Sequence, residues 1–380
     1  MDLSTEMKKL LVLFSLLLLS VGAQAATLKS LYNVSVIVES QSTAARDKAI
    51  TDSFADLLVK ITGMPTVAER EGVAEMLNNA KRYVRSFRYQ QIKPVTRENV
   101  VSLWQTEAEP EVLQTTESEE ESAPQQRLIV SFDEKAVGDA LWKARLPVWG
   151  KTRPATLMWV AFQDSEKRML IDSKQKTELQ EYVDQQAGKR GLPIMLPRMD
   201  EADKNKINVT DVWGGYRAPL ELASLSYGAD VVASARLLLK NDNTWESRWS
   251  LMQGDDVEYW RVEAPDVESL LKQGVDDLAE RISQRYVHVA TVSDGEAVIY
   301  VSDVNNVFDY NRVSKYLNGL AGVKKAELIE VKANQVAFKL DLRSSAKLLK
   351  QSIALGKTLA SNDMFGTESQ ESLFNYRLKP

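Results

Sequence analysis

The stretch from Leu141 to Phe162 reads LWKARLPVWGKTRPATLMWVAF, and we interpret it as the joint between two domains. Its first part, up to Leu146, continues a helical pattern. Pro147 ends that pattern, because the proline ring cannot continue a helix and pushes the preceding residue toward an extended conformation. From Ala155 onward the stretch has almost no polar residue, which is typical of a β-strand covered on both faces.

The N-terminal residues predict export. An apolar run at residues 10–21 follows two lysines, is too short to span a bilayer, and leads into Ala-Gln-Ala, a small-x-small cleavage signal. We therefore expect residues 1–25 to be a signal peptide that is removed after Ala25, leaving a periplasmic protein without a transmembrane anchor. The acidic segment before Met7 is unusual ahead of such a run, so translation from Met1 and from Met7 are both open.

The remaining 355 of the 380 residues exceed what one hydrophobic core usually serves. We predict a mixed, multidomain fold: an N-terminal α+β domain at 26–146, a central α/β domain with an antiparallel meander at 147–287, and a C-terminal ferredoxin-like βαββα module at 289–360. Residues 361–380 are predicted to be a flexible tail. The chain has no cysteine, which excludes disulfides, thiol nucleophiles and thiolate metal sites.

The formal charge of −5 comes largely from one segment. Residues 105–126 hold seven glutamates and no basic residue, a composition that predicts a disordered acidic loop. Such a loop could bind a cation or a basic partner, although a solvated loop is the commoner case. Without this loop and the signal peptide, 46 basic side chains stand against 44 acidic ones. A nearly neutral body argues against nonspecific binding of nucleic acid.

In the N-terminal domain, the apolar spacing predicts a long helix from Ala44 to Gly63 and a second helix from Val67 to Asn79. Residues 31–39, 82–92 and 128–132 are predicted strands. The segment 82–92, RYVRSFRYQQI, alternates aromatic and basic residues, which fits either a nucleic-acid surface or a sheet with one solvated side. Export separates the protein from nucleic acid, so we favour the sheet.

The central domain alternates strands with predicted helices at 172–190 and 219–227, and Asp211 to Gly215 is predicted to be a turn. This alternation indicates parallel strand pairs. Two hairpin turns then lead through a three-stranded meander between residues 231 and 262. From residue 289 the order β, α, β, β, α indicates a split βαβ unit.

No catalytic, cofactor-binding or metal-binding constellation stands out. His288 is the only histidine, whereas a catalytic triad or a histidine metal site needs several converging groups. Carboxylates cluster at 200–203 and 255–256, as a glycosidase would require, but both clusters lie in predicted turns. No phosphate-binding glycine loop is present. We therefore predict no cofactor and no enzymatic activity, and keep a hydrolase as a third alternative.

Seven tryptophans lie between residues 142 and 260. They are typical either of a carbohydrate platform or of packing in the core and at the domain joint, and the second interpretation is favoured where they alternate with polar neighbours. The candidate binding or domain-joint residues are Trp149, Arg153, Trp213 and Tyr216.

Several motifs recur in an order that resembles a known family. They are Tyr32 to Glu39, Ala44-Ala45-Arg46 through Gly63, Tyr83-Val84 with Phe87-Arg88-Tyr89, Leu146 to Gly150, Arg153-Pro154, Asp211 to Gly214, and Tyr227 to Asp230. This series resembles the domain-of-unknown-function 2066 family over about residues 28–287. The resemblance implies an exported protein of Gram-negative bacteria and brings no activity with it. The segment 228–232 with its meander is also similar to periplasmic modules of curli-secretion, Tol and cell-wall-synthase-activator type, which work by protein contact.

We therefore expect a periplasmic, non-catalytic protein that acts through contacts with envelope proteins, as an assembly or accessory factor. The alternative is a binding module for a small molecule or a glycan, with the tryptophan-rich joint as its cleft. An open aromatic pocket at Trp149 and Trp213 would favour the binding module, whereas a filled joint would favour the accessory factor.

Overall fold

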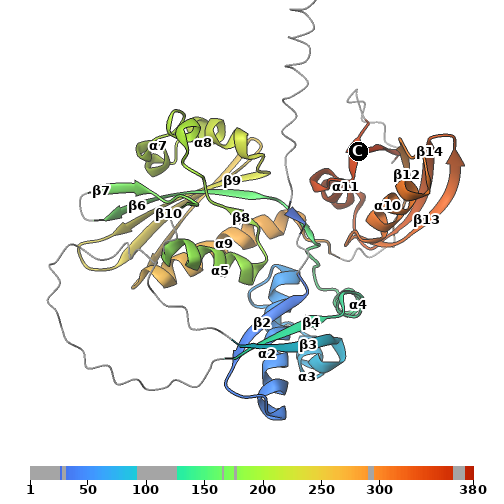
Figure 1. Ribbon diagram of the computed structural model, residues 1–380, viewed down its shortest axis with the longest axis horizontal. Helices are drawn as coiled ribbons and strands as arrows, with labels where there is room; N and C mark the ends of the chain where they lie inside the picture. The colour runs from blue at the N-terminus through green and yellow to red at the C-terminus, as the bar shows by residue number, and fades with distance from the viewer. Residues whose placement is uncertain are drawn as a thin grey trace, which may run out of the picture.

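The computed structural model describes residues 26–27, 31–91, 126–164, 167–174, 178–289, 295–362 and 373–380. They form a mixed α and β fold with a sheet in each of three units, as Figure 1 shows. The predicted signal peptide and residues 105–125 of the predicted acidic loop lie outside these ranges. Among the described residues, no helix has the length and the apolar character needed to cross a membrane.

The N-terminal unit is a three-stranded antiparallel sheet in the order β2-β4-β3. Its elements are β2 (Asn33–Val38), α2 (Thr43–Thr62), β3 (Val84–Gln91), β4 (Gln126–Phe132) and α4 (Glu134–Lys143). Helix α2 begins where the Ser42 side chain accepts a hydrogen bond from the Ala45 amide, and it ends at Gly63, whose φ is 73°. The helix buries Phe54 and Leu57 under the sheet, and most of β3 remains exposed. The aromatic and basic segment is thus a strand with a solvated side, as expected.

The second predicted helix is divided in two. Residues 67–79 form the 3-10 turn η1 (Val67–Glu69) and the short helix α3 (Val73–Asn78), followed by a further 3-10 turn, η2 (Ala80–Tyr83). Gly72 separates η1 from α3 with a φ of 82°, a value that glycine adopts without the steric cost of a side chain. The predicted helix runs across this glycine, and the backbone conformation of Gly72 explains why the structure divides it.

The central unit is built on a six-stranded sheet in the order β11-β10-β9-β6-β7, with β8 beside β6. Strand β6 runs parallel to β8 and β9, and the other pairs are antiparallel. The strands are β6 (Thr156–Asp164), β7 (Lys167–Leu170), β8 (Ile194–Met195), β9 (Val231–Leu239), β10 (Trp245–Gln253) and β11 (Asp256–Ala264). Residues Thr156 to Phe162 of β6 are all buried, which confirms a strand covered on both faces.

Helices lie on both faces of this sheet (Figure 1). One face is covered by α5 (Glu178–Arg190) and α9 (Val267–Tyr286), and the other carries α6 (Glu201–Lys204), α7 (Val209–Gly214), α8 (Arg217–Ser224) and the 3-10 turn η3 (Leu225–Tyr227). On the second face, α7 and α8 pack over β6, β7 and β9. The outer strands β10 and β11 continue that face beyond the helices, and Tyr259 of β11 is 67% exposed.

The predicted turn at Asp211 to Gly215 is instead the end of helix α7. The Asn208 side chain accepts hydrogen bonds from the amides of Thr210 and Asp211, while the Asp211 carboxylate accepts one from the Asn208 amide. This capping box begins the helix, and Gly215 ends it with a φ of 64°. The two glycines mark the helix end, which explains why the segment resembled a turn.

The C-terminal unit is a five-stranded sheet in the order β13-β14-β12-β16-β15. Its elements are β12 (Gly295–Ser302), α10 (Val307–Asn318), β13 (Val323–Lys332), β14 (Gln335–Leu342), α11 (Ala346–Leu355), β15 (Leu359–Ser361) and β16 (Leu373–Leu378). The first five follow the predicted β, α, β, β, α order. Strand β16 lies between β12, to which it is parallel, and β15, to which it is antiparallel. An added strand therefore separates two strands that would be neighbours in a ferredoxin-like sheet.

The segment predicted to be a flexible tail thus supplies an interior strand. Phe374, Tyr376 and Leu378 alternate along β16 and are all buried, whereas their neighbours Asn375 and Arg377 are exposed. This period of two is the usual signal of a half-buried strand. It was overlooked because a polar and acidic segment precedes it.

Candidate functional site

The domain joint is filled with side chains. Trp149 is 1% exposed, and the Arg153 guanidinium lies 3.9 Å above the centre of its ring. Arg153 is fully buried and donates to the carbonyl oxygens of Lys60, Trp149, Gly150, Arg190 and Gly191 at 2.7–3.3 Å. Burial lowers its pKa to about 9. The side chain therefore joins α2 of the N-terminal unit to the end of α5 in the central unit.

Two further contacts complete the joint. Arg190 binds the Asp276 carboxylate at 2.8 Å and the Gly63 carbonyl oxygen at 2.8 Å. Strand β5 (Thr152–Arg153) pairs with β1 (Ala26–Thr27), so the first described residues are held at the same place. Trp149 and Arg153 consequently serve as packing and hydrogen-bonding groups of the joint.

The C-terminal unit docks on the joint through His288. Its backbone pairs with Val148, its Nδ1 lies 2.7 Å from the Ser344 hydroxyl, and its Nε2 lies 2.8 Å from the Ser352 hydroxyl. Burial lowers the pKa of His288 to about 4. Arg343 adds a 2.9 Å ion pair to Asp139 on α4. The histidine is therefore a neutral group at a domain contact, in agreement with its place in the sequence near a boundary.

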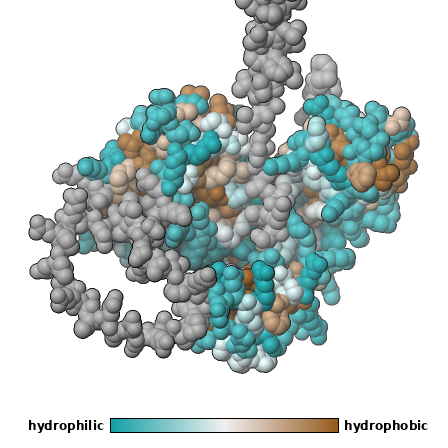
Figure 2. Space-filling view, viewed as in Figure 1, coloured by the Kyte–Doolittle hydropathy of each residue, from teal (hydrophilic) through white to brown (hydrophobic). Residues whose placement is uncertain are grey.

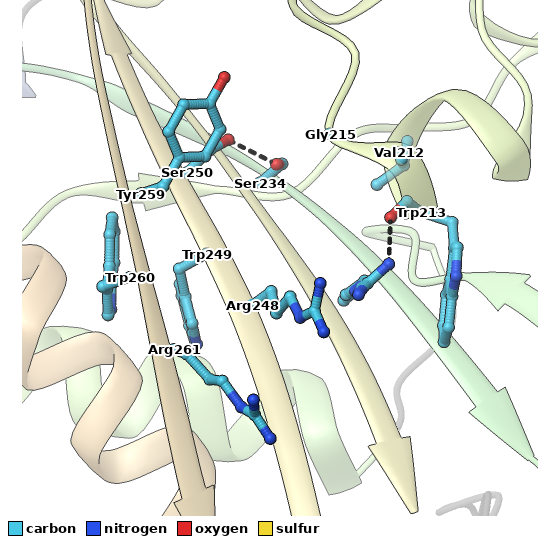
Figure 3. A pocket seen from close by; sticks show the side chains of 12 residues that line it. Val212, Trp213, Gly215, Ser234, Arg248, Trp249, Ser250, Tyr259, Trp260 and Arg261 are labelled. Carbon is cyan, nitrogen blue, oxygen red and sulfur yellow. Dashed lines mark hydrogen bonds between the residues drawn. The ribbon is translucent and has the colours of Figure 1, made fainter.

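An open pocket of about 420 Å³ lies on the face of the central sheet that carries α7 and α8 (Figure 3). One wall is the end of α7, from Val212 to Gly215. The rest comes from Ser234 and Arg236 of β9, from residues 248–250 of β10 and from residues 259–261 of β11. The pocket exists because α7 stops at Gly215 and leaves the outer half of the sheet face open.

Three arginines form a row across the floor of this pocket. Arg248 of β10 lies directly opposite Arg236 of β9 on one side and directly opposite Arg261 of β11 on the other. We call Arg236, Arg248 and Arg261 the arginine row. Side chains in directly opposite positions on neighbouring strands share a face, and like charges placed there destabilise the sheet. The repulsion within the arginine row must therefore be offset by acidic side chains or by a bound anion.

Glu246 provides part of the compensation. Its carboxylate, 9% exposed, accepts from Arg248 Nε at 3.0 Å and from Arg261 Nη2 at 2.7 Å. Arg261 also binds Glu263. Arg236 has no carboxylate partner among the residues that the structure describes, and its Nη1 lies 3.4 Å from the Trp213 carbonyl oxygen. Partial burial, and then the neighbouring charge of Arg248, lower the pKa of Arg236.

Trp213 lies beside this row, and two guanidinium groups lie near its ring. Arg168 of β7 lies 4.3 Å from the centre of the Trp213 ring, and Arg236 lies 5.4 Å from it. Tyr216 follows α7 and is 56% exposed, and its ring packs against the backbone at Gly214, where an added Cβ would come within 2.6 Å. The structure thus divides the four predicted residues into two pairs. Trp149 and Arg153 lie in the joint, whereas Trp213 lines the pocket and Tyr216 packs beside it at Gly214.

The pocket is suited to binding anions. Three arginines, at positions 236, 248 and 261, line it, a fourth, Arg168, lies beside Trp213, and the carboxylates bound to the row are those of Glu246 and Glu263. Its two serine hydroxyls, Ser234 and Ser250, are hydrogen-bonded to each other at 2.7 Å. Among the described residues, no three histidine, aspartate or glutamate side chains are grouped so that they could hold a metal ion.

The carboxylates weighed for hydrolysis have other contacts. Asp200 caps α6 by accepting from the amides of Ala202 and Asp203, and Asp203 is buried against the Tyr227 hydroxyl. Asp255 lies in the exposed turn between β10 and β11, 3.7 Å from an Arg217 nitrogen. These contacts account for the two clusters by turn and capping interactions.

The arginine row was not predicted from the sequence, although a signal was available. The hairpin turn at Asn241-Asp242-Asn243 sets the register that pairs residue 236 with 248. The turn at Gly254-Asp255 sets the register that pairs 248 with 261. Both turns are predicted from the sequence, and counting outward from them aligns the three arginines.

Comparison with known proteins assigns no activity. Residues 25–150 match the model of a domain of unknown function, DUF8605. An uncharacterised domain is therefore confirmed in this part of the chain, while membership of the domain-of-unknown-function 2066 family stays a prediction. No curated protein matches the sequence. One similar solved structure is the N-terminal domain of Protein Y from Thermus thermophilus, with 11% identity over 35% of this chain and 98% of that one. Its TM-score is 0.18, which supports no inference.

Proposed function

We propose that this protein is an exported, non-catalytic accessory factor of the cell envelope that works by binding other proteins. The filled joint supports this proposal most directly. Trp149 and Arg153 are buried, and Arg153 links the first two units through five backbone carbonyl groups. A joint of this kind holds the units in a fixed relation, which suits a scaffold better than a cleft that opens to admit a ligand.

The proposal includes a periplasmic location and membership of the domain-of-unknown-function 2066 family. The first rests on the apolar run and cleavage signal before residue 26, and the second rests on the ordered motifs from Tyr32 to Asp230. The match at residues 25–150 is to an uncharacterised domain, which assigns no location and names no partner.

The C-terminal unit offers a surface for such contacts. Its edge strand β13 exposes Leu328, Ile329 and Val331, and the start of α10 exposes Val307 and Phe308, the latter by 85%. Figure 2 shows apolar surface gathered on this unit. An edge strand carries unpaired backbone groups to which another chain can add a strand.

A binding module is the second candidate function, because the pocket beside Trp213 is open while the joint at Trp149 is closed. In this case the ligand enters the arginine pocket of the central unit rather than the tryptophan-rich joint. The two functions are compatible, since the pocket and β13 belong to different units.

Photo-crosslinking in the periplasm tests the proposal. A photoreactive residue would replace Phe308 or Val331 on the C-terminal unit, or Tyr216 beside the pocket, with Arg82 of the N-terminal unit as an exposed control position. Discrete protein adducts at the test positions and none at Arg82 would support an interaction protein and identify its partner. Absence of adducts at all three test positions would contradict it.

A further inference from the structure

We infer that the pocket beside α7 is a binding site for a phosphate group, held by the guanidinium groups of Arg236 and Arg248. This inference goes beyond the proposed protein contacts and does not depend on them. It rests on three features of the pocket: the alignment of the arginine row, the unused donors of two of its members, and the walls that surround them.

The alignment of the arginine row brings like charges close together. Neighbouring strands lie about 4.8 Å apart, so the backbones of the opposite arginines on β9, β10 and β11 lie within about 10 Å of one another. Opposite pairs of like charge lower the stability of a sheet. An anionic ligand would relieve this repulsion, and the relief would favour binding.

The unused donors whose charge is least compensated by the protein belong to Arg236 and Arg248. Arg248 gives only its Nε to Glu246, so its two terminal nitrogens have no partner among the described residues. Arg236 gives one nitrogen to a carbonyl oxygen at 3.4 Å and pairs with no described carboxylate. Arg261 also leaves Nε and Nη1 without a partner among the described residues, but its charge is balanced by two carboxylates, those of Glu246 and Glu263. Arg261 and Glu246 therefore orient Arg248, and Arg236 and Arg248 remain to bind the ligand.

The chemistry of these donors favours phosphate. The planar guanidinium group presents paired N–H donors that match two oxygens of a phosphate, and arginine is the preferred residue for such contacts. The Ser234 and Ser250 hydroxyls share one hydrogen bond, which leaves one hydroxyl proton free to donate. A phosphate has three or more acceptor oxygens for two guanidinium groups and a hydroxyl, whereas a carboxylate has two.

The walls indicate that the phosphate belongs to a larger molecule. Trp213 stands at one side of the pocket and the exposed Tyr259 at the other, as Figure 3 shows. Aromatic surfaces of this kind pack against the sugar, glycerol or ring that carries a phosphate. The carrier is either a soluble phosphate ester or an anionic phospholipid, because the same headgroup chemistry serves both.

Thermal unfolding of the full mature chain tests the inference. Its melting temperature would be measured with inorganic pyrophosphate, with glycerol 3-phosphate, and with sodium chloride at equal ionic strength. Binding to vesicles of phosphatidylglycerol and of phosphatidylcholine would be measured by co-sedimentation. The variants are Arg236→Gln and Arg248→Gln, with Arg88→Gln on the exposed strand β3 as a control that removes the same charge.

Either of two results would support a phosphate site. The soluble phosphates raise the melting temperature above the chloride control, or the phosphatidylglycerol vesicles alone bind the protein. In each case the apparent affinity for the phosphate compound or the vesicles falls at least tenfold in Arg236→Gln and in Arg248→Gln. It is retained in Arg88→Gln. The first result identifies a soluble ester and the second a lipid. No response to any phosphate, or a response that all three variants lose equally, would overturn the inference. The crosslinking experiment detects protein adducts, so the two proposals can fail separately.

Discussion

Arg248 and Arg261 lie directly opposite each other on β10 and β11, and both bind the carboxylate of Glu246. This arrangement makes Glu246 the group that allows two like charges to share one face of the sheet. It also fixes the direction of Arg248, whose terminal nitrogens are left for the pocket. In this pocket the Glu246 carboxylate therefore partly neutralises the charges of Arg248 and Arg261.

Replacement of Glu246 should destabilise the fold. In Glu246→Gln two arginines lose their shared partner, and we expect the free energy of unfolding to fall by about 1–2 kcal/mol. Chemical denaturation measures the change. Glu263→Gln is the matched control, because Glu263 is half exposed and binds the same Arg261, and surface pairs of this kind contribute about 0–1 kcal/mol. A larger loss in the control than in Glu246→Gln would contradict this role.

Removal of Arg236 should leave the ligand-free protein as stable as before or slightly more stable. Arg236→Met keeps an apolar stem against Trp213 and removes one like-charge pair, so a gain of a few tenths of a kcal/mol, up to about 0.5 kcal/mol, is expected. Urea unfolding in phosphate-free buffer measures it. A loss above about 1 kcal/mol would show that Arg236 is needed for the fold rather than for a ligand.

A glycine of α9 should resist replacement. A Cβ at Gly274 would overlap the Trp249 indole, so Gly274→Ala is expected to lower stability by about 1–3 kcal/mol despite the better helix propensity of alanine. Gly188→Ala is the matched control, because Gly188 lies on the exposed side of α5 with nothing within 4 Å of an added Cβ. That variant should gain about 0.5–1 kcal/mol. Calorimetric melting of both variants distinguishes the outcomes, and equal behaviour would be inconsistent with tight packing at Trp249.

His288 should make stability depend on pH between about 7 and 4. Its pKa is lowered in the folded protein to about 4 from an ordinary value of 6.5, so the unfolded chain binds the proton first as the pH falls. The contribution of the neutral histidine is therefore complete above about pH 7 and is lost progressively below it. Between pH 7.5 and 5.5 we expect a loss of about 1 kcal/mol from this group.

The measurement is urea unfolding at both pH values for the natural protein and for His288→Asn. The asparagine variant keeps a polar group near Ser344 and lacks the titration, so its loss between the two pH values should be smaller by about 1 kcal/mol. An equal loss in both proteins would assign the pH dependence to other groups.

Local patterns in the sequence predicted much of the fold. The long helix α2 and the strand β6 were recognised because their apolar residues lie close together in the chain. The division of the second helix at Gly72 was not predicted, since the pattern itself continues across the glycine. Strand β16 was missed although Phe374, Tyr376 and Leu378 alternate, because a polar segment isolates it from the rest.

The candidate site was less accessible to sequence reasoning. Trp213 was selected as an aromatic residue, but its arginine neighbours come from β7 and β9, which are distant in the chain. Arg153 is also atypical, because a buried arginine becomes favourable only when carbonyl groups from Lys60 and from residues 190–191 converge on it. Such convergence depends on tertiary structure, whereas the alignment of the arginine row follows from the register of two hairpins alone.

Nuclear magnetic resonance of the arginine side chains tests the central claim about the pocket most directly. The Nε–Hε signals of Arg236, Arg248 and Arg88 would be assigned by substitution and followed while pyrophosphate is added at constant ionic strength. The account predicts that the Arg236 and Arg248 signals shift together and saturate at one ligand per chain, while the signal of Arg88 stays in place. Equal drift of all three signals, or Arg236 and Arg248 signals that stay unchanged both with pyrophosphate and in a repeat with water-soluble short-chain phosphatidylglycerol, would contradict it.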